Sequence, residues 1–136
     1  MSAEIAVQTA LRARLIATPA VMQVVPPASI LDAHKRPAPR PSILLGESLA
    51  LRGSDIARRR ELVTHTIHVY VEEPSTEGMK NIVAIIRDAI LAARLDLAPA
   101  YHCADWDVVS TRSLRDPDGE TSHGVVTVEV LAERLP

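Results

Sequence analysis

Apolar residues recur every three or four positions in two stretches of the chain, which is the spacing of one face of an α-helix. In residues 2–18 this stripe is formed by Val7, Leu11 and Leu15. Ser2 precedes the stripe, and its hydroxyl can cap a free backbone N–H of the first turn. The second stretch opens at residues 74–75 and reaches about residue 95. The pattern predicts two amphipathic helices that pack on a shared core.

Residues 61–71 are the clearest β-strand candidate, because successive side chains of a strand point to opposite faces. One face would carry Val63, Ile67, Val69 and Val71, and the other Leu62, Thr64, Thr66, His68 and Tyr70. Residues 43–47 are a short strand candidate, and two further strands are expected over residues 103–115 and 122–133. The last two are joined by Asp116, Pro117, Asp118 and Gly119. This is a strong reversal signal, since an Asp-Gly pair accepts positive φ.

Two segments follow neither period. Prolines punctuate residues 25–42, and each proline removes a backbone donor and biases its predecessor toward extended geometry, so we expect an extended connector there. Residues 49–60 contain Gly53 and Asp55 and end in three consecutive arginines. We expect a long, mobile, basic loop over residues 49–60, of the kind that usually serves recognition.

The order of these elements predicts an α+β fold. A helix, two strands, a second helix and a β-hairpin lack the regular alternation of a parallel α/β protein. We therefore expect an antiparallel sheet of about four strands with two helices packed on one face. A chain of 136 residues suits one domain over residues 1–136.

Composition excludes several classes of function. Aromatic residues make up only 2% of the chain, which argues against base-stacking platforms for single-stranded nucleic acid and against aromatic-lined ligand pockets. Cys103 is the one cysteine, so the chain has no internal disulfide and no multi-cysteine metal site. There is no apolar run of membrane-spanning length and no secretory signal pattern, so we expect a protein made in the cytoplasm.

Charge is unevenly distributed, although the net charge is only −2. Residues 1–60 contain nine basic and four acidic side chains, whereas residues 61–136 contain six basic and thirteen acidic ones. Opposite charges on different surfaces of one subunit suit head-to-tail association of identical copies. Two solvated faces are the plainer interpretation, and a nucleic-acid patch at residues 58–60 is a third one with weak support.

Candidate catalytic groups are few. His65 and His68 are an odd number of residues apart on a strand and so face opposite sides, where they cannot chelate one ion. A dyad of His102 and Cys103 would need sequence neighbours to align as base and nucleophile. A cation site or an acid–base pair could be built from Asp105 and Asp107, but a solvated edge is the simpler interpretation. The motifs of nucleotide-binding proteins, serine hydrolases and zinc proteases are missing.

Several short sequence segments, taken together, carry a resemblance to a known family. They are the opening helix, the proline-rich segment leading into Pro-Ser-Ile-Leu-Leu-Gly-Glu at 41–47, and Thr-Ile-His-Val-Tyr at 66–70. The most specific phrase is Leu-Arg-Asp-Pro-Asp-Gly-Glu-Thr-Ser-His-Gly-Val at 114–125. With these phrases the chain resembles the tail-completion, or tail-terminator, proteins of long-tailed phages, most closely the version found in gene transfer agents. One departure is Ser122, where the resemblance leads us to expect an aromatic residue before His123.

The resemblance implies a structural virion protein rather than an enzyme, with no cofactor. It implies a homo-hexameric ring at the head–tail junction that caps the tail-tube protein, contacts the head-side connector, or stopper, and lets DNA pass through its lumen without sequence recognition. The particle would be assembled in a bacterial cytoplasm, with no membrane partner. Our candidates for the subunit or partner interface are Arg52, Arg58, Arg59, Arg60, Glu72, Glu73, Asp116 and Asp118.

Two alternatives remain open at this point. Another head-to-tail connector, a stopper or an adaptor, would share the logic of a ring but would bind the portal side instead of the tube. An enzyme or small-ligand protein would need a pocket converging on Asp105 and Asp107 or on His102 and Cys103.

Overall fold

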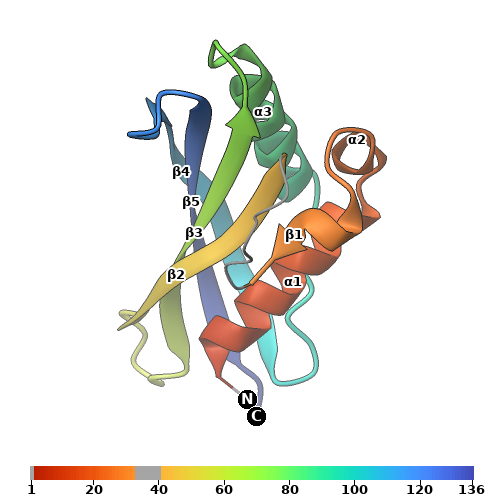
Figure 1. Cartoon of the computed structure of the whole chain (residues 1–136). Coiled ribbons are helices and arrows are strands. Elements are labelled where there is room, and N and C mark those ends of the chain that lie inside the picture. Colours follow the sequence, from red (N-terminus) through yellow and green to blue (C-terminus); the bar gives the residue numbers. More distant parts are fainter. Residues whose placement is uncertain (1, 33–40) are drawn as a thin grey trace.

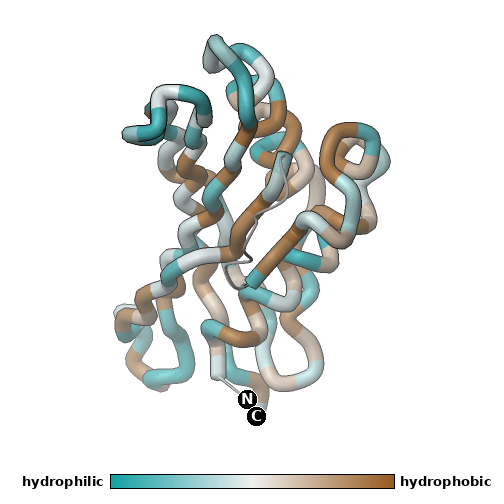
Figure 2. The backbone as a smooth tube through the Cα atoms, in the orientation of Figure 1, coloured by the Kyte–Doolittle hydropathy of each residue, from teal (hydrophilic) through white to brown (hydrophobic). Residues whose placement is uncertain are grey.

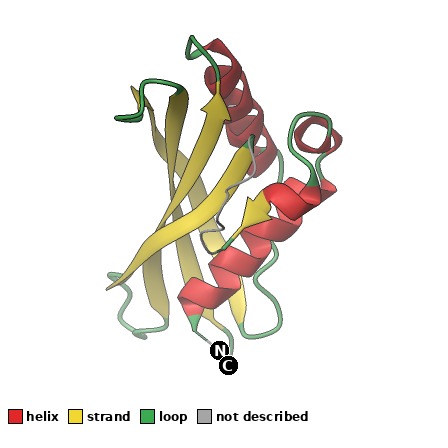
Figure 3. Cartoon of the chain, in the orientation of Figure 1, coloured by secondary structure: helices red, strands yellow, loops and turns green. Residues whose placement is uncertain are grey.

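The computed structural model describes residues 2–32 and 41–136, which form a sheet with its long helices on one face (Figures 1 and 3). In chain order the elements are α1 (Ala3–Ala17), α2 (Pro19–Met22), the 3-10 helix η1 (Pro27–Ser29), β1 (Ile30–Leu31), β2 (Ser42–Arg52), β3 (Arg60–Glu72), α3 (Glu77–Leu91), β4 (Tyr101–Arg115) and β5 (Thr121–Arg134). Residues 33–40 of the expected connector, with Lys35, Arg36 and Arg40, lie outside the described residues.

Within the described residues the sheet has five strands in the order β1-β2-β3-β5-β4. The expected α+β class is confirmed, but the expectation of about four antiparallel strands and two helices is corrected, because residues 2–32 and 41–136 form a mixed five-stranded sheet and three α-helices. The additional strand, β1, pairs in parallel with Ile43 and Leu44 of β2. A two-residue strand has no period of its own, so no sequence pattern reveals it. Similarly, Pro19 ends α1 as expected but then occupies the first position of α2.

Strand β2 is longer than the sequence predicts, and the expected loop over residues 49–60 is wrong in its bounds. Leu49, Leu51 and Arg52 pair with β3, so the connection covers only residues 53–59. The cause is a register shift between Leu45 and Ser48. A bulge of this kind changes which residues face the core, and it therefore hides the alternation on which a strand prediction depends.

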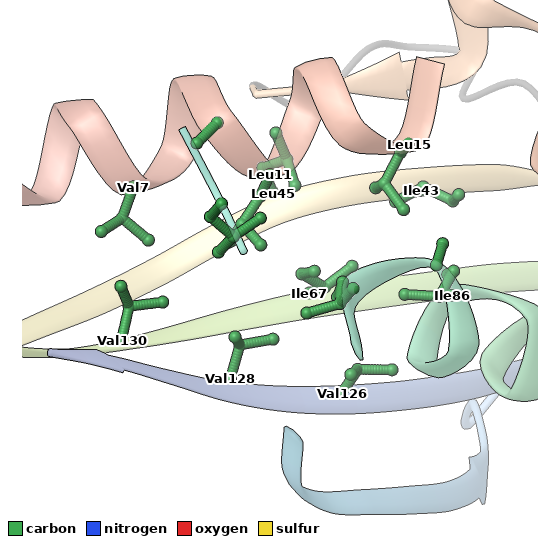
Figure 4. Close-up of a cluster of buried hydrophobic side chains, with 14 of the residues drawn as sticks. Val7, Leu11, Leu15, Ile43, Leu45, Ile67, Ile86, Val126, Val128 and Val130 are labelled. Carbon is green, nitrogen blue, oxygen red and sulfur yellow. The ribbon is translucent and has the colours of Figure 1, made fainter. Parts of the chain in front are cut away.

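The core lies between the helices and the inner face of the sheet (Figure 4). Every second residue of β3 and β5 is buried there, including Val63, Ile67 and Val128. Leu11 of α1 and Ile86 of α3 pack on them, both fully buried. Figure 2 shows the same alternation of apolar and polar residues along the strands. Branched aliphatic side chains thus fill a core that contains almost no aromatic rings.

Helix α1 matches its prediction closely. The Ser2 hydroxyl accepts a hydrogen bond from the Ile5 N–H at 3.1 Å, as expected for an N-cap. Arg14 has a role that its place outside the stripe did not indicate. Its guanidinium donates to the carbonyls of Ala89, Ile90 and Arg94 at 2.8, 3.1 and 2.9 Å. Arg14 therefore satisfies the carbonyl groups left unpaired where α3 ends and ties the two helices together.

Helix α3 ends at Leu91, before the predicted end near residue 95. The chain turns there so that Leu95 and Leu97 can also enter the core, each at most 3% exposed. At the other end of the sheet, α3 lies very close to β5 at Gly124. A Cβ at this position would be 2.7 Å from both Met79 Sδ and Val83 Cγ2, so only glycine allows this approach.

Candidate assembly surfaces

The turn at residues 53–59 connects β2 to β3, and together with Arg52, the last residue of β2, it forms the surface that we call the basic hairpin tip (residues 52–59). Asp55 organises it, because its carboxylate accepts from the N–H groups of Arg59 and Arg60 at 2.8 and 3.2 Å. These hydrogen bonds lower the pKa of Asp55, and the bond from the Arg59 N–H has the largest effect. Arg58 adopts a left-handed backbone with φ 55°. The tip is thus a turn with internal hydrogen bonds to its own backbone.

Three predicted arginines project from this tip. Arg52, Arg58 and Arg59 are exposed, whereas Arg60 is half-buried, with its Nε 3.3 Å from Glu133 Oε1 on β5. Ile56 lies between them and is 100% exposed. A single exposed apolar side chain is ordinary on a protein surface, but Ile56 belongs to the same hairpin as the exposed Leu49 and Leu51, and a group of exposed apolar side chains is typical of a contact surface.

The predicted acidic residues lie at the other end of the sheet, where β3 ends and β4 turns into β5 (Figure 1). Three of the four carboxylates contact groups of their own chain, Glu73 and Asp118 through backbone N–H groups and Asp116 through His123 Nδ1 at 3.6 Å. Asp118 accepts from the N–H groups of Glu120 and Thr121, both at 2.9 Å, and shapes the predicted turn, with Gly119 at φ 74°. Glu73 accepts from the N–H groups of Gly78 and Met79, both at 3.0 Å, and so caps α3.

Glu73 also explains the unusual Ser122. The Ser122 side chain is fully buried, and its hydroxyl lies 2.9 Å from Glu73 Oε1 and 3.2 Å from the Val71 carbonyl oxygen. An aromatic ring could not make these bonds, so the departure from the family pattern has a local function. Burial alone would raise the pKa of Glu73, but the hydrogen bonds from Met79, Ser122 and Gly78, together with the charge of Arg115, keep it below its ordinary value.

A second acidic cluster, which we call the β4 acidic edge, consists of Asp105, Asp107 and Glu129. Asp107 pairs with Glu129 across the β4–β5 ladder, and Asp105 shares their face of the sheet. They border a shallow groove of about 210 Å³ whose apolar lining is Leu62, Trp106, Val109 and Leu131. The two aspartates are the cation-site candidate that the sequence offers, with a solvated edge as the simpler interpretation. Within the described residues, however, no three His, Cys, Asp or Glu side chains are placed to hold a metal ion.

The uncovered face of the sheet also carries a chain of polar side chains that sequence analysis did not connect. Glu47 Oε1 is 2.8 Å from His68 Nε2, and His68 Nδ1 is 2.8 Å from His123 Nε2. On the far side of His123, Nδ1 is 3.6 Å from Asp116 Oδ1, and the ring of Tyr70 stacks on the His123 ring at 4.5 Å between centroids. This row of polar side chains thus connects β2, β3, β5 and the turn before β5.

The carboxylate of Glu47 determines which nitrogen of His68 donates a hydrogen bond to it. Glu47 can only accept, so His68 donates to it from Nε2–H, and a single proton lies between His68 Nδ1 and His123 Nε2 in their hydrogen bond. The hydrogen bond from His68 lowers the pKa of Glu47. The pKa of His123 is lowered mainly by burial and to a smaller extent by the charge of His68. If both imidazoles were charged, two N–H groups would face each other, so the arrangement stabilises the strands only while at least one ring is neutral.

The described residues contain no arrangement suited to nucleophilic catalysis. His102 is exposed and the neighbouring Cys103 is buried, so they point to opposite sides of β4 and form no dyad. Burial raises the pKa of the Cys103 thiol, which disfavours the reactive thiolate. His65 and His68 lie on opposite faces of β3, as predicted. None of the described helices has the length and apolar character needed to cross a membrane.

Comparison with known proteins agrees with these observations. The model of the family described as "Tail completion protein gp17" matches residues 9–133. A chain from the virion of a native gene transfer agent particle superimposes with a TM-score of 0.85 at 18% sequence identity, covering 98% of this chain and 99% of that one. The gp17 protein of bacteriophage SPP1 superimposes with a TM-score of 0.63, also at 18% identity, over 94% of this chain and 89% of its own. No curated protein sequence matched significantly.

Because the family model spans nearly the whole sequence, the chain belongs to the tail completion protein gp17 family. It is accordingly a structural tail protein of a phage-like particle and not an enzyme, as the resemblance of its sequence phrases indicated.

Proposed function

We propose that this protein is a tail terminator that forms a hexameric ring, caps the end of the tail tube and joins it to the head-side connector, with DNA passing through the lumen. The observation that carries the proposal is the family match over residues 9–133. The likeness in fold to the gene transfer agent chain, which covers 98% of this chain and 99% of that chain, supports it further. The particle would be a gene transfer agent or a related phage tail.

The charged surfaces support a ring. The basic hairpin tip and the predicted acidic residues lie at opposite ends of the sheet of the same subunit, so the basic surface of one copy can meet the acidic surface of the next copy. Surfaces of this kind meet head to tail, and head-to-tail contacts close into a ring when the rotation between copies allows it. Of the predicted interface residues, Arg52, Arg58, Arg59 and Glu72 are exposed, whereas Glu73 and Asp118 already hold turns of their own chain.

The direct test is light scattering with negative-stain imaging of the purified protein, alone and mixed with its tail-tube protein. We expect six-fold rings, or caps at the ends of tubes. A protein that stays monomeric and does not bind tube ends at any salt concentration would contradict the proposal. In that case the second candidate, a stopper or adaptor, predicts binding to the portal protein in the same assay.

A further inference from the structure

Strand β4 ends the sheet, and in the described part of the chain no other strand pairs with its outer edge. Along this edge lie Asp105 and Asp107, both exposed, and Val109, which is 45% exposed. The groove beside them has apolar walls and an acidic rim, completed by Glu129 of β5. A free strand edge with an apolar groove is a surface for association, and its acidic rim requires a basic partner.

The opposite side of the sheet carries the complementary features. β1 pairs only with Ile43 and Leu44 of β2, so residues 48–52 have no described strand on their outer side. Leu49, Leu51 and Ile56 are 56%, 52% and 100% exposed there, beside the arginines of the basic hairpin tip. This side thus presents apolar side chains within a basic surround, the inverse of the groove on β4.

The strand register places the exposed leucines of β2 and the β4 acidic edge at the same position along the strand direction. Leu51 pairs with Leu62, Leu62 pairs with Leu131, and Leu131 pairs with Asp105, so one line across the sheet joins the hairpin to the β4 acidic edge. The line crosses four strands and is about 14 Å long at the usual strand spacing. Each of the three steps is antiparallel, so β2 and β4 run in opposite directions. Two copies with the same orientation therefore bring β4 of one antiparallel to β2 of the next without rotation in the plane of the sheet.

We infer that the β2–β3 hairpin of one copy docks on the β4 acidic edge of the next copy. In this arrangement Leu51 lies level with Asp105 and Leu49 with Asp107, along the apolar groove. The turn that carries Ile56, Arg58 and Arg59 lies beyond this line, level with the start of β4, and the long arginine side chains reach back toward the acidic rim. The occupant is a second copy of this chain, because the complementary surface, with opposite charge and a matching position along the strands, is present on the same molecule. The inference rests on the proposed ring and names the contact that closes it.

Two charge-reversed proteins test this contact. The first is Arg58→Glu with Arg59→Glu, and the second is Asp105→Arg with Asp107→Arg. Each protein alone would place like charges across the interface, and we expect it to lose rings at concentrations where the native protein forms them, with association at least about 100-fold weaker. In an equimolar mixture, every hairpin can meet an edge of opposite charge if the two proteins alternate, and we expect rings to return.

The matched control is Lys80→Glu with Arg87→Glu, which makes the same charge change on the exposed face of α3 and should leave rings intact. Circular dichroism and unfolding curves establish that each variant is folded. Arg58 and Arg59 are suitable sites, because Asp55 holds the turn through backbone N–H groups, which these substitutions retain.

The outcomes separate this inference from the proposed function. Rings formed by either reversed protein alone, or no recovery in the mixture, would overturn the hairpin–edge contact while leaving the terminator role intact. Failure of the native protein to form rings, alone or on tube ends, would overturn the ring itself.

Discussion

His65 is a titratable side chain in the apolar core. It lies on the inner face of β3 between Val63 and Ile67 and is fully buried, and neither ring nitrogen has a hydrogen-bond partner among the described residues. Burial lowers the pKa of His65, because a charged imidazole would lose its hydration. The nearby charges of Glu47 and Glu4 only partly oppose this effect. The folded protein therefore holds His65 neutral at a cost in stability.

This placement predicts how stability depends on pH. The folded pKa lies below the unfolded value of about 6.5, so the unfolded chain takes up the proton first and the free energy of unfolding falls as the pH drops below about 6.5. We expect His65→Leu to raise the free energy of unfolding by about 1 kcal/mol at pH 7.5. It should also flatten the decline between pH 6.5 and 5, measured by urea unfolding.

His123 is the control for this prediction, because its pKa is lowered as well and its contribution should survive in the His65→Leu protein. A pH dependence identical to that of the native protein would show that His65 does not titrate in this range. Carboxylates with lowered pKa values act only at lower pH and do not interfere.

At the scale of elements, the segment between β3 and α3 depends on one carboxylate. Glu73 caps two N–H groups of α3 and accepts from the buried Ser122 hydroxyl, so it connects β3, α3 and β5. Its neighbour Glu72 is exposed and forms the last residue of β3. Two adjacent glutamates with the same charge thus have different structural roles.

We expect Glu73→Ala to lower the free energy of unfolding by about 2 kcal/mol, the upper range for loss of a helix cap. Glu72→Ala is the matched control and should change it by less than about 0.5 kcal/mol. Because the folded pKa of Glu73 lies below its ordinary value, its contribution is present above about pH 4.3 and is lost as the pH falls through the folded pKa. Equal effects of the two substitutions in thermal or urea unfolding would contradict the capping role.

The elements differ in how far the sequence predicts them. α1 and β3 follow from their periods and α1 also from its cap, because those signals lie within the element itself. The bulge in β2 interrupts the alternation of buried and exposed residues partway along the strand. The strand nevertheless continues as far as Arg52, because β3 supplies hydrogen-bond partners up to that residue. Pairing with a distant segment, not local pattern, therefore determines where β2 ends.

For the whole molecule, the exposed apolar residues concentrate where we infer a contact between copies. Ile56 is the clearest case, since its side chain is fully exposed and contributes little to the folded subunit. Burying such a side chain in an interface stabilises association by about 1.5–3 kcal/mol. Unlike the arginines, it does so without dependence on salt.

We therefore expect Ile56→Ser to weaken ring assembly about tenfold or more for each contact, with unchanged unfolding of the subunit and an unchanged dependence of assembly on salt. Sedimentation or light scattering over a salt series measures both quantities. Val24→Ser is a suitable control, because Val24 is also partly exposed but follows α2, away from the hairpin. Equal assembly of the two variants would exclude Ile56 from the interface.

The sequence alone determined the α+β class, the two long amphipathic helices, the Asp-Pro-Asp-Gly turn and the separation of charge between the two halves of the chain. These features arise from residues within one element or one turn, where period, capping and backbone preference act locally. Its phrases also indicated the tail-completion family, which the family match confirmed.

Only the tertiary structure decided which distant residues meet. His68 and His123 are 55 positions apart, and Arg14 caps carbonyls 75 or more residues away. The hairpin and the β4 acidic edge share one line only because β3 and β5 lie between them in a fixed register. Strand order and register arise from the packing of all elements together, so no local pattern contains them.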